Sequence, residues 1–190
     1  MKINGVAAIT GISELKPESD ASGKKTLDLL ATAARLAIKD AGLTKPDIDG
    51  LLVTPAVEDS AFMWPAQVAE YLQISPQYIN VVELGGASAV SAVARAAVAV
   101  AAGLCRHCLC LSGGVWDSQV FNSLEGKMAV MSQAEIDYDL PCGPMGFNSA
   151  YALVARKHMC EYGTRAEQLA KIAVDQRTSS LHNPLALYND

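Results

Sequence analysis

The stretch that most constrains the fold is VVELGGASAVSAVARAAVAVAAG, residues 81–103, in which an apolar strand pattern runs through two glycines into a helix pattern. The helix, expected over 87–102, is apolar on nearly every side and offers water only Ser88, Ser91 and Arg95. Such a helix belongs in a membrane or deep inside a large protein. Because Arg95 interrupts the longest apolar run, we expect no membrane span.

We therefore expect this helix to be covered on both sides, with a sheet on each side. The sequence offers only about four core strands, too few for two sheets of ordinary size. Either another polypeptide covers the helix, or the chain is part of a larger construction. One alternative stays open: a small doubly wound domain whose helix is rich in alanine because alanine is small and favours helices.

The rest of the core alternates strand and helix patterns at short intervals, which is typical of a mostly parallel sheet with right-handed crossovers. The predicted strands are 3–10, 50–54, 80–84 and 108–112, and the predicted helices are 26–40, 65–72, 87–102, 147–162 and 165–179. Residues 115–145 do not show this alternation of strand and helix patterns. We expect an α/β core over residues 1–114 and a loop or cap region over 115–190, whose helices return to the core.

Composition excludes several functional classes. The chain has 190 residues and a formal net charge of −5. It contains no basic run, which argues against a nucleic-acid surface. The start MKINGVAAITGIS has too short an apolar region for a signal peptide, and it is better explained as a first strand. Five cysteines, an odd number, without a secretory signal indicate reduced thiols and a cytoplasmic location.

Three segments carry a resemblance to a known family. They are VAEYLQISPQYINVVE, LGGASAVSAVARAAVAVAAGLCRHCLCLSGG and PMGFNSAYALVARKHMCEYGTRAEQLAKIAVDQRTSSLHNP. Together they resemble the thiolase superfamily, above all its sterol-carrier or lipid-transfer branch. The resemblance implies two similar halves stacked in αβαβα layers with mixed, mostly parallel sheets, in which each central helix is buried between two sheets. Only the amino-terminal half, with part of its loop region, has a counterpart here.

The resemblance also places a reactive position. In thiolases the nucleophilic cysteine begins the central helix, where backbone N–H groups and the helix dipole lower its pKa. The matching residue here is Gly86, which cannot form an acyl-enzyme. The helix N-terminus can still hold an oxyanion, and the missing side chain leaves room for a bulky acyl group. We expect Gly85, Gly86, Ser88 and Met145 to bind substrate, Met145 because it matches a family stretch near the acyl pocket. The catalytic residues stay unassigned.

The pattern around Gly86, with no cysteine at the nucleophile position, resembles the thiolase-like aldolases of steroid side-chain degradation. That implies a retro-aldol carbon–carbon lyase acting on a bulky β-hydroxyacyl-CoA, with its acid and base in the carboxyl-terminal half. Coenzyme A would enter as part of the substrate, and no covalently bound cofactor is expected. The resemblance further implies a homodimer and a small partner subunit with an OB-like fold and a zinc ribbon. Two alternatives stay open: a thiolase-type acetyl-CoA acyltransferase, and a non-catalytic subunit that binds acyl-CoA or lipid.

Two further features invite a chemical interpretation. Ser88 could bond a substrate carbonyl, although a serine in the first turn of a helix more often satisfies a backbone donor. CRHCLC suggests a metal site, but Cys108 and Cys110 share one face of a predicted strand and no second ligand pair follows at zinc-ribbon spacing. We expect buried thiols there and no metal. Cys142 lies in a predicted loop and is the one thiol to test for reactivity.

Overall fold

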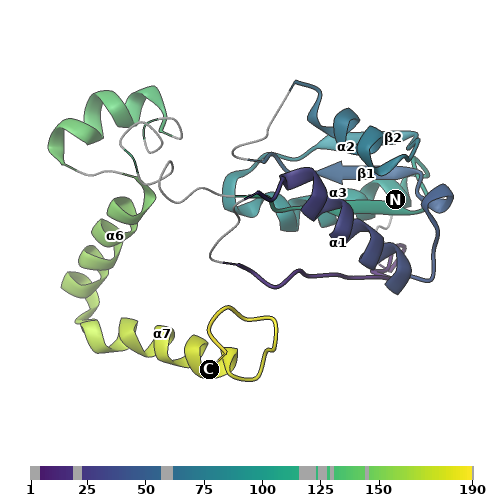
Figure 1. Cartoon of the computed structure of the whole chain (residues 1–190). Helices are drawn as coiled ribbons and strands as arrows, with labels where there is room; N and C mark the ends of the chain where they lie inside the picture. Colours follow the sequence, from purple (N-terminus) through teal and green to yellow (C-terminus); the bar gives the residue numbers. More distant parts are fainter. Residues whose placement is uncertain are drawn as a thin grey trace. The chain divides into compact units, whose positions relative to one another are not determined.

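A computed structural model gives the fold of the chain (Figure 1). It describes residues 5–18, 23–56, 62–115, 123, 128, 131–143 and 146–189. The chain divides into two compact units, Met1–Trp116 and Asp117–Asp190. Each unit is described on its own below. The domain boundary predicted after residue 114, and the return of the cap helices to the core, stay predictions.

The first unit is built on a small parallel sheet in the order β2-β1-β3. Its strands are β1 (Gly50–Val53), β2 (Tyr78–Val81) and β3 (Cys108–Leu111). In register, Gly50 lies opposite Tyr78 on one side and Cys108 on the other. The α/β class and the parallel pairing predicted from the sequence are confirmed, whereas a mixed sheet is not seen among the described residues.

Helices cover both faces of this sheet because the side chains of β1 alternate. Leu51 and Val53 pack with α1 (Thr26–Asp40) and α2 (Trp64–Leu72), whereas Leu52 packs with α3 (Ser88–Ala101). Figure 1 shows α1 and α3 on opposite sides of the sheet. All four residues of β1 are buried, as expected for the central strand of a parallel sheet.

The strand predicted over 3–10 is wrong for its described part, because residues 5–10 form no strand. Instead the segment that follows runs along α1. The Ile12 N–H donates to the carboxylate of Asp40 at 2.9 Å, and the Ser13 hydroxyl donates to the carbonyl of Ala33 at 2.7 Å. At Gly11 the backbones come so close that a Cβ would lie 2.4 Å from the carbonyl oxygen of Ala37. Hydrogen bonds to α1 therefore hold this segment, in place of the pairing with a neighbouring strand that a β-strand would make.

Only one face of α3 is packed by the described residues of the first unit. Its buried residues, Ser88, Ala92, Ala96 and Ala99, form a single stripe against the sheet. On other sides of the helix Val90 is 76% exposed, and Val93 and Val98 are also exposed. The expectation that α3 is buried between two sheets is not met within this chain, which carries one sheet in its described part.

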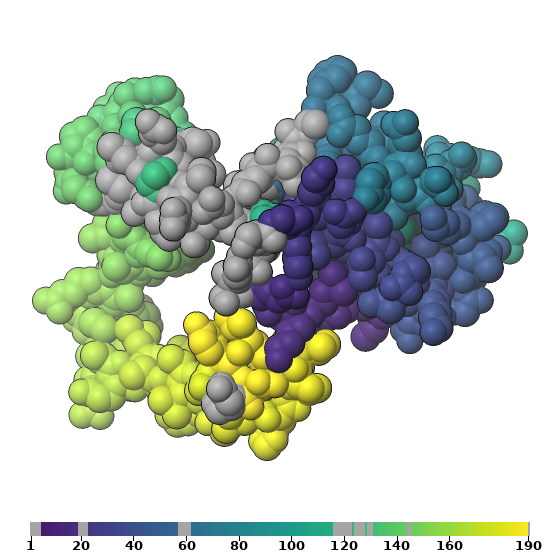
Figure 2. Space-filling model, viewed as in Figure 1, coloured from purple at the N-terminus to yellow at the C-terminus, as the bar shows by residue number. Residues whose placement is uncertain are grey.

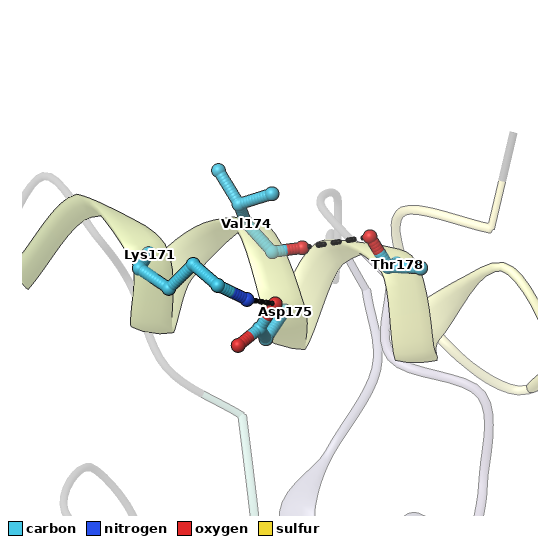
Figure 3. Close-up of polar contacts among 4 residues, drawn as sticks. All are labelled: Lys171, Val174, Asp175 and Thr178. Carbon is cyan, nitrogen blue, oxygen red and sulfur yellow. Dashed lines mark hydrogen bonds and ion pairs between the residues drawn. The ribbon is translucent and has the colours of Figure 1, made fainter. Parts of the chain in front are cut away.

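The second unit contains α6 (Phe147–Tyr162) and α7 (Ala166–Ser180), preceded by a π-helical turn, η3 (Glu135–Asp139), and a 3₁₀ turn, η4 (Leu140–Cys142). Neither α6 nor α7 has a buried residue. The ion pair of Lys171 with Asp175, one helical turn apart, supports α7, and the Thr178 hydroxyl donates back to the Val174 carbonyl at 2.9 Å (Figure 3). Among the described residues, no helix is both long and apolar enough to cross a membrane.

Candidate functional site

The candidate site lies where β2 ends and α3 begins. Val82 continues the strand, since its N–H donates to the Val53 carbonyl at 2.9 Å. The chain then bends at Leu84 and forms the 3₁₀ turn η2 (Gly85–Ala87), which leads directly into α3. This bend explains why the strand predicted over 80–84 ends early. In open α/β sheets, ligands bind outside the carboxyl ends of the strands, which is where this turn lies.

The two glycines of η2 differ in what their backbones require. Gly85 has φ of +55°, a left-handed value that favours glycine. Gly86 has no such constraint, and a Cβ added at either residue would meet nothing within 4 Å. Glycine at position 86 is therefore required neither by its φ nor by crowding from the described residues of the first unit, which leaves function or a covering segment as its explanation.

The turn offers free backbone donors at the positive end of a helix. The Ala87 N–H is used internally, donating to the Leu84 carbonyl at 3.1 Å. The N–H groups of Gly85 and Gly86 have no acceptor within the described part of the chain, and both residues are exposed. Two such N–H groups beside the helix dipole are suited to hold a developing negative charge on an oxygen.

Ser88 is buried and its hydroxyl fastens this turn. It accepts the Leu84 N–H at 2.8 Å and donates to the Gly85 carbonyl at 2.7 Å. The hydroxyl proton is thus committed to the backbone, which agrees with the interpretation that the sequence favours, a serine that satisfies a backbone donor. A direct role for Ser88 in binding substrate stays a prediction.

The same edge of the sheet carries a polar group that sequence reasoning missed. The Thr54 hydroxyl, after β1, donates to the Ser112 hydroxyl, after β3, at 3.0 Å. The fully buried hydroxyl of Thr26 accepts the Val115 N–H at 3.1 Å, and a Cβ on Gly114 would lie 3.1 Å from the Thr26 methyl group. Gly113 and Gly114, which follow the strand predicted over 108–112, were the available signal, since a glycine often marks close backbone approach.

Two thiols of the first unit, Cys105 and Cys108, are poor nucleophiles, whereas the hydrogen bond from Cys108 lowers the pKa of Cys110. Burial raises the pKa of Cys105, and a hydrogen bond with Cys110, reinforced by burial, raises the pKa of Cys108 well above its usual range. Within the described residues, no group of three His, Cys, Asp or Glu side chains could hold a metal ion. Cys142 is exposed in η4, whereas Met145 lies outside the described residues.

The chain is similar to several known proteins. It is 32% identical to a steroid side-chain-cleaving aldolase of Thermomonospora curvata, over 97% of this chain and 47% of that protein. It is 29% identical to an acetyl-CoA acetyltransferase of Methanothermobacter thermautotrophicus, over 85% of this chain and 42% of that protein. It is 27% identical to a 17-hydroxy-3-oxo-4-pregnene-20-carboxyl-CoA lyase of Mycobacterium tuberculosis, over 98% of this chain and 48% of that protein. No family model matches the chain.

The fold agrees with these relatives. A solved Ltp2-ChsH2(DUF35) aldolase superposes with a TM-score of 0.76 at 30% identity, over 98% of this chain and 46% of that chain. The chain is therefore a homologue of the thiolase-like aldolases of steroid degradation and of an acetyl-CoA acetyltransferase, and the resemblance stated from the sequence is confirmed. The chain spans about half the length of the curated relatives it matches.

Proposed function

We propose that this chain supplies the oxyanion-binding part of an acyl-CoA lyase that cleaves a carbon–carbon bond by a retro-aldol reaction. One observation carries the proposal: Gly86, which by the resemblance matches the nucleophile position of thiolases, lies just before α3 with a free N–H and open space around it. Two of the relatives are named as a side-chain-cleaving aldolase and a CoA lyase, which supports the same chemistry.

The reaction needs no covalent intermediate. A base removes the hydroxyl proton of a β-hydroxyacyl-CoA, the bond between the α and β carbons breaks, and a ketone or aldehyde leaves. The electron pair of the broken bond forms an enolate of the thioester. The enolate oxygen accepts hydrogen bonds from the N–H groups of Gly85 and Gly86. Protonation of the enolate carbon then releases a shorter acyl-CoA. The base belongs to the part of the relatives' length that this chain does not span. Coenzyme A is thus part of the substrate.

The assembly follows from the open face of α3. A second sheet from the remaining half of the relatives' length would cover Val90 and Val93, and complete the αβαβα layering. A homodimer and a small partner subunit with an OB-like fold and a zinc ribbon belong to the same proposal. The solved neighbour is named as an Ltp2-ChsH2(DUF35) aldolase, which supports a complex of more than one subunit. The cytoplasmic location stays a prediction.

The test is an assay of the chain together with the polypeptide that completes the relatives' length. A panel of β-hydroxyacyl-CoA esters, from small to steroid-sized, should yield a ketone or aldehyde and a shorter CoA ester. The variant Gly86→Val fills the open space and should lower kcat/KM more for bulky than for small acyl groups. A matched control is Ala66→Val, on the exposed side of α2 across the sheet from α3. CoA-ester binding without cleavage of any ester would instead indicate a non-catalytic subunit.

A second candidate is acyl transfer, which the acetyl-CoA acetyltransferase relative favours. It requires a nucleophile other than residue 86, and Cys142 is an exposed thiol of the described residues. Incubation with an acyl-CoA followed by peptide mass spectrometry separates the two candidates. An acyl adduct on a cysteine would support transfer, whereas the lyase should show none.

A further inference from the structure

A groove on the other face of the sheet is used by nothing proposed above. It runs between α1 and the end of α2, encloses about 560 Å³, and lies across the sheet from α3. Figure 2 shows α1 and α2 side by side on the visible face of the first unit. A volume of this size is in the range of small-molecule sites, roughly 300–1,000 Å³.

The floor of the groove is apolar. It is formed by Ala31, Ala34, Ile38, Leu43, Leu72 and Ile74. Four of these side chains belong to the buried core and are held in place by the packing of α1 and α2 on the sheet. The floor is therefore a fixed surface, able to accept a hydrocarbon chain or ring without rearrangement.

The rim is cationic, with Arg35, Lys39 and Lys45 all exposed. Arg35 and Lys39 are one helical turn apart, where like charges repel and destabilise a helix. None of these three side chains has an ion-pair partner among the described residues. Three cations that are unpaired among the described residues lie together on an apolar groove, although the net charge of the chain is −5. An anionic ligand would offset their mutual repulsion.

The neighbouring carboxylates, of which Asp28 also lines the groove, form no ion pair with these cations among the described residues, and each accepts a hydrogen bond from another group. Asp28 accepts the hydroxyl of Tyr71. Asp40 accepts the Ile12 N–H at 2.9 Å. Asp47 accepts the N–H and the hydroxyl of Thr44 at 2.7 and 2.6 Å. The cations of the rim are thus left facing solvent over an apolar floor.

We propose that this groove binds an amphipathic anion, with its apolar part on the floor and a carboxylate or phosphate monoester between Arg35, Lys39 and Lys45. A guanidinium with two lysines suits such a head group, because arginine can bond two oxygens of one anion at once. The site is separate from the η2 turn and does not depend on the proposed lyase activity. A carboxylate and a phosphate share this chemistry, and the test separates them.

Calorimetric titration of the full chain with decanoate and with decyl phosphate tests the proposal. At least one anion should bind, and decyl glucoside, which lacks charge, should bind at least about tenfold more weakly. Arg35→Gln and Lys39→Gln should each weaken binding about tenfold, as expected for the loss of one charge-assisted bond. The matched control Arg95→Gln removes the same charge from α3 and should change nothing.

A second variant leaves the charges intact. Ala31→Phe fills the groove from a half-buried position of its floor and should abolish binding, while circular dichroism and the melting temperature report whether the variant still folds. Equal binding of decyl glucoside and the anions would overturn the proposal, and so would anion binding that is insensitive to Arg35→Gln and Lys39→Gln. Binding of an acidic peptide in the absence of any amphiphile binding would also overturn it, by making the groove a protein-docking surface.

Discussion

Asp49, directly before β1, is hydrogen-bonded to the residues at the starts of β2 and β3. Its carboxylate accepts the N–H of Arg106 at 2.9 Å and that of His107 at 2.8 Å, at the entrance to β3. Its carbonyl accepts the N–H groups of Gln77 and Tyr78, at the start of β2. Burial raises the pKa of this carboxyl group, but the bonds from the two backbone N–H groups outweigh it and hold the pKa below its ordinary value.

The variant Asp49→Asn should therefore be less stable than the wild type at pH 7, and the difference should shrink in acid. A carboxyl group whose pKa is lowered by folding stabilises the folded state above its unfolded pKa, about 4, and this contribution disappears as the pH falls through the folded pKa. Urea unfolding at pH 7 and pH 3 measures it. Asp137→Asn, in the exposed η3, is the charge-matched control. An equal loss at both pH values would contradict this account.

At the residue scale, the sequence located the turn of the candidate site but not its full surroundings. Gly85 and Gly86 could be placed because a strand pattern, two glycines and a helix pattern follow one another. Thr54 and Ser112 could not, because their meeting depends on the pairing of β1 with β3, which are far apart in the chain. Ser88 could be placed in the first turn, while its bonds to Leu84 and Gly85 depend on the bend that the glycines create.

At the scale of elements, α3 has two unlike faces made of nearly the same residue types. Ala92 and Ala96 pack on Leu52 and Val82 in the core, whereas Ala94 is exposed. A small side chain is required on the packed face because the helix lies close to the sheet.

The variant Ala92→Leu should destabilise the chain by about 1–3 kcal/mol, the usual cost of inserting methylene groups into a packed core. Ala94→Leu makes the same change on the exposed face and should lie within about 0.5 kcal/mol of the wild type. Chemical denaturation of both variants gives the comparison. If the two changes were equally costly, the packed face of α3 would not be the one described.

The predicted elements agree best with the structure where the pattern is local. The helix predicted over 26–40 is observed as Thr26–Asp40, and that over 147–162 as Phe147–Tyr162. The strand predicted over 3–10 fails in its described part because alternation alone does not provide a neighbouring strand. The covering of α3 on both sides is not seen among the described residues, since it depends on a second sheet.

At the scale of the whole molecule, each unit leaves apolar side chains exposed. In the first unit Val90 and Val93 lie on the open side of α3. In the second, Phe147, Tyr151 and Val154 follow one another along one face of α6 and are all exposed. Contiguous exposed apolar surface of this kind marks an interaction site.

The isolated chain should therefore bind an apolar fluorescent dye and self-associate as its concentration rises. The double variant Val90→Lys with Val93→Lys should reduce both effects, and sedimentation velocity with dye titration measures them. Ala66→Lys with Gln67→Lys, on the exposed side of α2, adds the same charge elsewhere and is the control. A monomer at all concentrations that binds no dye would contradict the prediction.

The buried central strand has a consequence for how the first unit opens. Leu51 and Val53 belong to the cluster under α1 and α2, and Leu52 to the cluster under α3, so both layers meet in four residues of β1. The amides of this strand should be among the last in the first unit to exchange with deuterium, because freeing them requires the loss of both layers at once.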